Sequence, residues 1–172
     1  MTRVAVGMGA NLGDRLATLQ AALAELALSL SEVRVSAVYE TAPVGGPEGQ
    51  PAFLNAVAVG TTTRAASDLL GAMQAIEASH GRVRDVRWGP RTLDLDLLAY
   101  GTDVSADPVL TLPHPRAHLR AFVLVPWAEI EPSYALPGLG LVGDLAARLP
   151  PGEVEGVRRR ADLNLYPGQV PA

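Results

Sequence analysis

The sequence predicts an α+β fold: a ferredoxin-like βαββαβ antiparallel sheet with helices on one face, plus a C-terminal helical extension. Three observations support this expectation. Residues 93–97 alternate leucine with aspartate, and a period of two indicates a strand. Leucines recur at spacings of three and four across residues 12–30, which predicts an amphipathic helix. Breaks rich in glycine and proline separate such runs into the order strand, helix, strand, strand, helix, strand.

Each element in the first part of the chain follows from its local pattern. An apolar run predicts a buried strand near the start, and alternation predicts the later strands. The expected bounds are strands 3–8, 33–40, 52–61 and 93–100, helices 12–30 and 64–80, and an irregular loop at 41–51. The second helix is expected to bury Leu69, Leu70, Met73, Ile76 and Glu77.

The pattern is less regular after Gly101. We expect an edge strand at 109–112 and a helix at 116–130 that Pro126 ends or kinks. A short amphipathic helix is expected at 140–149. These elements form the predicted C-terminal extension.

No linker, repeat or low-complexity tract divides the chain. We therefore expect a single domain over residues 1–155. The end of the chain has few apolar residues and several glycines and prolines, so a peripheral C-terminal tail is expected over 156–172. The Arg158-Arg159-Arg160 run is interpreted as a solvated part of that tail.

The composition excludes several classes of function. The 172 residues are 48% apolar and 19% charged, which is typical of a globular protein. A net charge of −4 argues against a general nucleic-acid binder. The absence of cysteine excludes disulfides and thiolate sites, and all fourteen basic residues are arginine, so a P-loop lysine is excluded as well. No signal-peptide run or membrane-spanning stretch is present, so a cytoplasmic protein without membrane contact is expected.

The stretch from Arg82 to Tyr100 concentrates the residues that carry chemistry. It holds Arg82, Arg84, Arg87 and Arg91 around Trp88 and Gly89-Pro90, followed by Asp94 and Asp96. Carboxylates two apart on one strand face lie about 6–7 Å apart. At an effective dielectric near 20 they repel by roughly 2.5 kcal/mol. The pair therefore favours a bound cation, and beside an arginine-rich loop it indicates Mg²⁺ and a polyphosphate.

The acidic pair also has a plainer interpretation. Paired acids commonly form a solvated strand face, and some of the arginines could pair with Asp85, Glu77 or the aspartates. Several arginines, a tryptophan and a glycine-proline turn lie just before the acidic pair, and these neighbours favour the metal interpretation.

The glycines Gly7, Gly9 and Gly13 allow two interpretations. They resemble a loose dinucleotide fingerprint, with Glu40 as the ribose-binding acid, which would indicate a nicotinamide-dependent reductase. The alternative is a tight strand-to-helix turn capped by Asn11 or Asp14, and we favour this turn. A third hypothesis is a non-enzymatic ferredoxin-like ligand-binding module.

Two further groups of residues are candidates for binding. His114 lies between prolines, ahead of Arg116, His118 and Arg120, and could complete a phosphate clamp; the alternative is a polar helix face, which we prefer for His118. Phe53 and Asn55 could stack on a flat heterocycle and pair with its polar edge, although each phenylalanine alone could be a core residue.

Together these segments resemble the 6-hydroxymethyl-7,8-dihydropterin pyrophosphokinase family. The resemblance covers roughly residues 3–130, and the RWGPRTLDLD stretch at 87–96 is its most specific part. The other matching segments are Gly7 to Asp14, Tyr39 to Pro43, Gln50 to Ala56, Glu77 with Gly81 to Arg84, and Leu112 to Phe122. The sequence departs from the commonest family pattern at Ala10, at Pro115 and in a longer 41–55 loop.

The resemblance implies a reaction. The family transfers the terminal diphosphate of ATP to the hydroxymethyl oxygen of a reduced pterin and releases AMP, so the attack is at the β-phosphorus. It implies ATP and the pterin as small-molecule partners and Mg²⁺ as the cofactor. We expect the chain to act as a monomer.

The resemblance also assigns roles to residues. It implies that Asp94 and Asp96 bind two Mg²⁺ ions and that Arg82, Arg91, Asp94 and Asp96 are catalytic. The implied ATP-binding residues are Gln74, Glu77, Arg82, Arg84, Arg91, Leu97, Thr111, His114 and Arg120. The implied pterin-binding residues are Thr41, Val44, Phe53, Asn55, Trp88, Asp94 and Phe122. Trp88 would move in as the arginine loop closes over the substrates.

Overall fold

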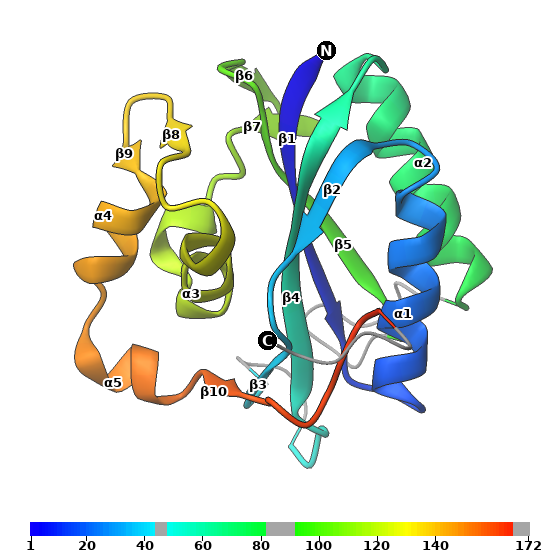
Figure 1. Ribbon diagram of the computed structural model, residues 1–172, viewed down its shortest axis with the longest axis vertical. Helices are drawn as coiled ribbons and strands as arrows, with labels where there is room; N and C mark the ends of the chain where they lie inside the picture. The colour runs from blue at the N-terminus through cyan, green and yellow to red at the C-terminus, as the bar shows by residue number, and fades with distance from the viewer. Residues whose placement is uncertain (44–47, 82–91, 167–172) are drawn as a thin grey trace.

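The computed structural model describes residues 1–43, 48–81 and 92–166. An antiparallel six-stranded sheet forms its centre, in the order β10–β3–β4–β1–β5, with β2 also paired to β4 (Figure 1). The strands are β1 (Thr2–Ala10), β2 (Ser31–Val35), β3 (Tyr39–Thr41), β4 (Phe53–Thr62), β5 (Asp94–Tyr100) and β10 (Arg158–Arg159).

Helices cover both faces of this sheet (Figure 1). On one side lie α1 (Arg15–Leu26) and α2 (Ala66–Ser79), the two helices that the sequence placed together. On the other side lies α3 (Ala121–Ile130), followed by α4 (Val142–Ala147) and α5 (Pro151–Glu155). The predicted antiparallel sheet with helices is thus confirmed, and the C-terminal helices add a third layer.

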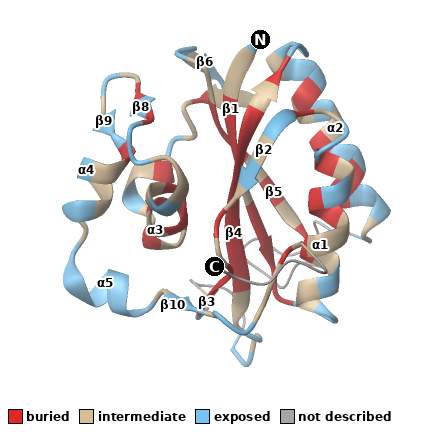
Figure 2. Cartoon of the chain, in the orientation of Figure 1, coloured by how far each residue is buried: buried red, intermediate tan, exposed pale blue. Residues whose placement is uncertain are grey.

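Strand alternation divides the core into two clusters. Val4, Val6 and Met8 of β1 pack toward α1 and α2, where Leu19, Leu23, Leu69 and Met73 meet them. Ala5 of β1 packs toward α3, in a second cluster around Leu124 and Trp127. Figure 2 shows the buried residues concentrated along the central strands and on the inward sides of the helices. Both faces of the sheet are therefore largely removed from water.

The predicted strand at 33–40 is two strands with an irregularity between them. Ser36 lies at the break, where its backbone N–H donates to Val57 O at 2.9 Å and its hydroxyl accepts from Val57 N–H at 3.0 Å. The N–H of Ala37 turns away from the sheet and donates to the Glu129 carboxylate at 2.7 Å. A side chain from α3 therefore satisfies the backbone group that the break releases.

The predicted helix at 116–130 is also divided. A 3₁₀ turn, η1 (Ala117–Leu119), precedes α3, and Arg120 between them has extended backbone angles. Pro126 lies inside α3 and does not end it. The break at Arg120 changes the direction of the chain just before Phe122.

Two short hairpins complete the described structure. The expected edge strand near 109–112 is β7 (Leu110–Leu112), which pairs with β6 (Ser105–Asp107) in a separate two-stranded sheet. The second hairpin joins β8 (Ala135–Leu136) to β9 (Gly140–Leu141) ahead of α4, which is shorter than the predicted helix.

The end of the chain differs from the predicted peripheral tail. β10 pairs with β3 at the edge of the main sheet. Leu165 is buried in the first core cluster, and Gln20 of α1 donates a 2.7 Å hydrogen bond to Asn164 O. Apolar burial and backbone pairing therefore attach residues 158–166 to the body of the protein. Among the described helices, none is both long enough and apolar enough to cross a membrane.

Candidate functional site

A cavity of about 850 Å³ lies between the sheet and the C-terminal layer. Strands β1, β3, β4 and β5 supply one side of it, and the segment from His114 to Val123 supplies the other. Residues on and after α5 line its remaining edge. The cavity is therefore built from segments that are far apart in the sequence.

Two glycines of β1 form the floor of the cavity. In the sheet register, Gly9 lies between Asn55 of β4 and Asp94 of β5, and Gly7 lies between Val57 and Asp96. A Cβ atom on Gly9 would lie only 3.0 Å from Asn55 Oδ1. Because these glycines have no side chain, the space above β1 stays open between the side chains of β4 and those of β5.

This finding corrects the interpretation of the glycines as one turn. Gly7 and Gly9 are inside β1, and only Gly13, with a φ of 64°, belongs to the turn. The predicted capping role of Asp14 is confirmed, since its carboxylate accepts from Ala17 N–H at 3.1 Å. A dinucleotide fingerprint needs these glycines in the loop between strand and helix, so the reductase interpretation loses its structural basis.

The aspartates of β5 share one face of the strand, as their alternation predicted, and that face borders the cavity. Asp94 and Asp96 line it, whereas Leu93, Leu95 and Leu97 are buried on the opposite face, against α1 and α2. Asp96 lies near His114, with 3.9 Å between Oδ1 and the imidazole Nε2. Two carboxylates and an imidazole therefore share one end of the cavity.

The surroundings of His114 hold its ring in the neutral form. Burial lowers the pKa of His114, and the charges of Arg120 and Arg116 lower it further, while Asp94 opposes them. The backbone N–H of Arg116 donates to Nδ1 at 3.2 Å, so the ring proton is on Nε2, the nitrogen on the Asp96 side. His114 thus offers a neutral N–H donor at this end.

The opposite end of the cavity carries an aromatic ring and an amide. Phe53 and Asn55 lie on the cavity side of β4, and Thr41 lies beside them on β3. Asn55 Nδ2 donates to Thr41 Oγ1 at 2.7 Å, and both residues are buried. With its nitrogen held by Thr41, Asn55 directs its oxygen toward Gly9 and the cavity.

The C-terminal layer adds Phe122 and Arg120. Both residues line the cavity, and the Arg120 guanidinium lies 5.4 Å from the centre of the Phe122 ring, a cation–π distance. The 3₁₀ turn and the break at Arg120 bring these side chains to the cavity.

Four predicted ATP-binding residues do not line the cavity that the described residues form. Gln74 is exposed on α2, and Leu97 is buried in the first core cluster. Glu77 is buried and accepts a hydrogen bond from Leu95 N–H at 3.2 Å, and Thr111 donates to Asp107 O at 2.9 Å. The predicted residues Val44, Arg82, Arg84, Trp88 and Arg91 lie outside the described residues.

The donor set fits magnesium bound together with a nucleotide. Among the described residues, no group of three or more histidines, cysteines, aspartates or glutamates could hold a metal alone. Mg²⁺ commonly takes one or two carboxylates and completes its shell with water and substrate phosphates. Asp94 and Asp96, on one strand face beside an open cavity, match that requirement.

Sequence reasoning missed part of the cavity wall. Gly152, Glu153, Gly156 and Val157 line it from the C-terminal segment that was expected to be peripheral. Nothing in their local pattern indicates a site, because their position depends on the pairing of β10 with β3.

Comparison with known proteins identifies the family. The model of the 7,8-dihydro-6-hydroxymethylpterin-pyrophosphokinase (HPPK) family matches residues 5–132. The chain belongs to the HPPK family. The 2-amino-4-hydroxy-6-hydroxymethyldihydropteridine pyrophosphokinase of Pseudomonas aeruginosa is 45% identical over 160 residues, covering 91% of this chain and 96% of that protein. The Mycobacterium leprae protein of the same name is 46% identical over 172 residues, covering 92% and 88%.

Solved HPPK structures share the fold. The structure of Plasmodium falciparum HPPK-DHPS with pterin and p-hydroxybenzoate superposes with a TM-score of 0.64 at 15% identity. It covers 86% of this chain but only 43% of the longer Plasmodium chain, so this protein spans less than half the length of that HPPK-DHPS polypeptide.

Proposed function

We propose that this HPPK-family chain transfers the diphosphate of ATP to the hydroxymethyl group of 6-hydroxymethyl-7,8-dihydropterin and releases AMP, a step of folate biosynthesis. One observation carries the proposal. A carboxylate pair and an aromatic–amide pair lie across one cavity, and the glycines of β1 lie between them in the sheet register. This arrangement suits the joining of a polyphosphate to a flat heterocycle.

The carboxylate end suits the nucleotide. Asp94 and Asp96 would hold Mg²⁺, which when bound neutralises phosphate charge and polarises the β-phosphoryl group. Around them, His114 offers a neutral Nε2–H, and Arg116 and Arg120 line the same cavity with positive charge. Such donors stabilise charge on phosphate oxygens without moving during the reaction. The number of Mg²⁺ ions, two by family resemblance, is part of the proposal.

The opposite end suits the pterin. Phe53 and Phe122 line the cavity, where their rings would stack on the bicyclic system, and Asn55 would accept a hydrogen bond from its N–H edge. The hydrogen bond to Thr41 orders the Asn55 side chain in the free protein, so pterin binding loses less side-chain conformational entropy. The pterin hydroxymethyl oxygen then faces the carboxylate end, where it forms a bond to the β-phosphorus as the bond to the AMP oxygen breaks.

Other expectations from the sequence extend the proposal. Arg82 and Arg91, with Arg84, would complete the nucleotide site, and Val44 and Trp88 would add pterin contacts. The strand order supports the finer ferredoxin-like description with an added C-terminal layer. Action as a cytoplasmic monomer is also part of the proposal.

Product analysis tests the reaction. ATP incubated with the protein, Mg²⁺ and hydroxymethyldihydropterin should give AMP by chromatography, and omission of the pterin should prevent it. Asp96→Asn, which replaces a carboxylate by an amide of the same shape, serves as the matched inactive variant. The appearance of ADP in place of AMP would refute the proposal. NADPH fluorescence, which tests the reductase hypothesis, should be unaffected by the protein.

A further inference from the structure

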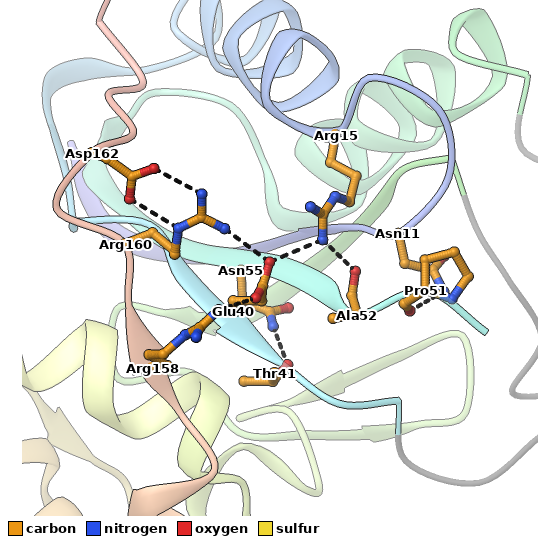
Figure 3. Close-up of polar contacts among 10 residues, drawn as sticks. All are labelled: Asn11, Arg15, Glu40, Thr41, Pro51, Ala52, Asn55, Arg158, Arg160 and Asp162. Carbon is orange, nitrogen blue, oxygen red and sulfur yellow. Dashed lines mark hydrogen bonds and ion pairs between the residues drawn. The ribbon is translucent and has the colours of Figure 1, made fainter. Parts of the chain in front are cut away.

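Glu40 lies at the centre of an ionic cluster outside the cavity. Its carboxylate meets three guanidinium groups: Arg15 at 3.2 Å, Arg160 at 3.0 Å, and Arg158 through a hydrogen bond to the other oxygen (Figure 3). Arg15 is the first residue of α1, Arg158 is in β10, and Arg160 directly follows β10. Three segments of the chain, including β3, therefore meet at the Glu40 carboxylate. The Glu40 side chain is only 17% exposed, which reduces solvent screening of these pairs.

Glu40 does not face the cavity, but its neighbour in β3 does. Glu40 points to one side of β3, and its neighbour Thr41 lines the cavity on the other side. Thr41 in turn accepts the 2.7 Å hydrogen bond from Asn55. The position of β3 therefore sets the position of the Thr41–Asn55 pair.

Few backbone contacts hold β3 by themselves. It has three residues, Tyr39–Thr41, and pairs with β4 on one side and with the two-residue β10 on the other. Arg160 fastens β10 in place, because its N–H donates to Val38 O at 2.8 Å and its guanidinium makes two bonds to Asp162, at 2.9 and 2.8 Å. The doubly bonded Arg160 thus presents a fixed nitrogen to Glu40.

Arg15 extends the cluster to the start of β4. The same Arg15 nitrogen that meets Glu40 also donates to Ala52 O at 2.8 Å, immediately before Phe53. Nearby, Asn11 Nδ2 donates to Pro51 O at 3.4 Å (Figure 3). Thr41 and Phe53, which are paired across β3 and β4, are therefore held from the face opposite to the cavity.

We propose that Glu40, Arg15, Arg158 and Arg160 form a clamp that positions Thr41, Asn55 and Phe53 for the pterin. The clamp rests on the proposed function, since it assigns the pterin to this end of the cavity. Its C-terminal half lies beyond residue 132, where the family match ends. The segment that carries β10 also supplies Val157 to the cavity wall, so the end of the chain helps to set pterin affinity.

The charge state of the clamp agrees with this role. Burial raises the pKa of Glu40, but the hydrogen bond from Arg158 and the charges of Arg160 and Arg15 outweigh it, so the pKa is lowered overall. Glu40 is therefore ionised at neutral pH. Arg158 is 69% exposed and Arg160 only 26%, so Arg160 should contribute more than Arg158.

Steady-state kinetics with both substrates test the clamp. Glu40→Ala and the double variant Arg158→Ala/Arg160→Ala should raise the pterin KM by about fivefold to tenfold, as expected for displaced charge-assisted hydrogen bonds. The ATP KM and kcat should stay within about twofold of the parent, because Asp94, Asp96 and His114 lie on other elements. Arg160→Lys, which keeps the charge without the paired geometry, should give an intermediate pterin KM.

Controls separate the possible failures. Arg148→Ala removes an exposed arginine of the C-terminal layer and should leave both KM values unchanged. Circular dichroism shows whether Glu40→Ala folds. If it does not fold, Arg158→Ala serves in its place, because Arg158 is exposed and its loss should leave the fold intact. A smaller rise in pterin KM in Arg158→Ala then supports the clamp. A parent-like pterin KM in the folded clamp variants would overturn the clamp. A parent protein that makes no AMP would instead overturn the proposed function.

Discussion

Replacement of Gly9 by alanine tests whether β1 is the floor of the pterin site. The new Cβ would lie 3.0 Å from Asn55 Oδ1, 3.7 Å from Phe53 Cδ1 and 3.9 Å from Leu54 O. The first of these contacts is shorter than ordinary carbon–oxygen packing by a few tenths of an ångström. The amide of Asn55 must therefore move, or β1 must separate from β4.

The size of the effect follows from what holds Asn55. Its nitrogen donates to Thr41 at 2.7 Å in a buried setting, and a buried polar group left without a partner costs about 1–3 kcal/mol. Since about 1.4 kcal/mol is a factor of ten, complete loss of this bond would weaken pterin binding by roughly fivefold to 150-fold. A displacement of a few tenths of an ångström should fall near the lower end, a rise of about fivefold to tenfold in pterin KM.

Kinetics with varied pterin and varied ATP, together with thermal unfolding, measure this prediction. Gly7→Ala is the matched change on the same strand and should have a smaller effect, because its Cβ would meet a movable Leu98 methyl at 3.4 Å. Gly71→Ala, in α2 with no atom within 4 Å, should leave the kinetics unchanged and stabilise the fold by about 0.5–1 kcal/mol. A Gly9→Ala protein with the parent's pterin KM would refute the assignment of the glycine floor.

Three other predictions follow from the described contacts. Asp96→Asn should lower kcat by about a hundredfold or more without changing the thermal midpoint, measured by AMP release; a parent-like kcat would exclude a role for the carboxylate charge. Glu77→Ala should lower the free energy of unfolding by about 1–3 kcal/mol in urea titrations, because Leu95 N–H loses its buried acceptor; an unchanged midpoint would contradict this. The hydrogen bond from Arg160 lowers the pKa of Asp162 from 3.8 to about 2, although burial opposes this shift. The Arg160–Asp162 pair therefore stabilises the fold at pH values above the ordinary aspartate pKa. That stabilisation is lost as the pH falls toward 2. The difference in unfolding free energy between the parent and Arg160→Ala should therefore be smaller near pH 2 than at neutral pH, and a constant difference would rule the pair out as its source.

Local patterns were sufficient for the residues whose role depends on their neighbours in sequence. The alternation at 93–97 predicted that Asp94 and Asp96 share a face opposite three buried leucines, and the structure confirms it. A strand has a period of two wherever it packs, so this prediction needed no tertiary information. The RWGPRTLDLD stretch likewise indicated the family that the comparisons identify.

Local patterns failed where distant strands decide the role of a residue. Gly7 and Gly9 fit a turn as well as a strand, because glycine is permissive in both. Their actual position reflects Asn55 and Leu98, which approach from β4 and β5. The sequence distance between these segments hides that relation from any window along the chain.

The C-terminal segment shows the same limit. A run of three arginines is ordinarily solvated, and no local pattern shows that Glu40, 118 residues away, is the partner of Arg158. In the fold, Glu40 and Asp162 supply carboxylates to Arg158 and Arg160, and β3 supplies an open edge for β10. The expected tail is therefore part of the sheet, because Glu40 pairs with its arginines and β3 pairs with β10.

By itself, the sequence determined the chemical character of this protein: its strands and helices, its carboxylate pair, its aromatic and amide candidates, and its family. Only the tertiary structure decided which of those side chains share a cavity, that glycines provide its floor, and that residues 158–166 join the main sheet and core. The physical reason is that periodicity and residue chemistry are local properties. Register between strands and the meeting of charges more than a hundred residues apart exist only once the chain has folded.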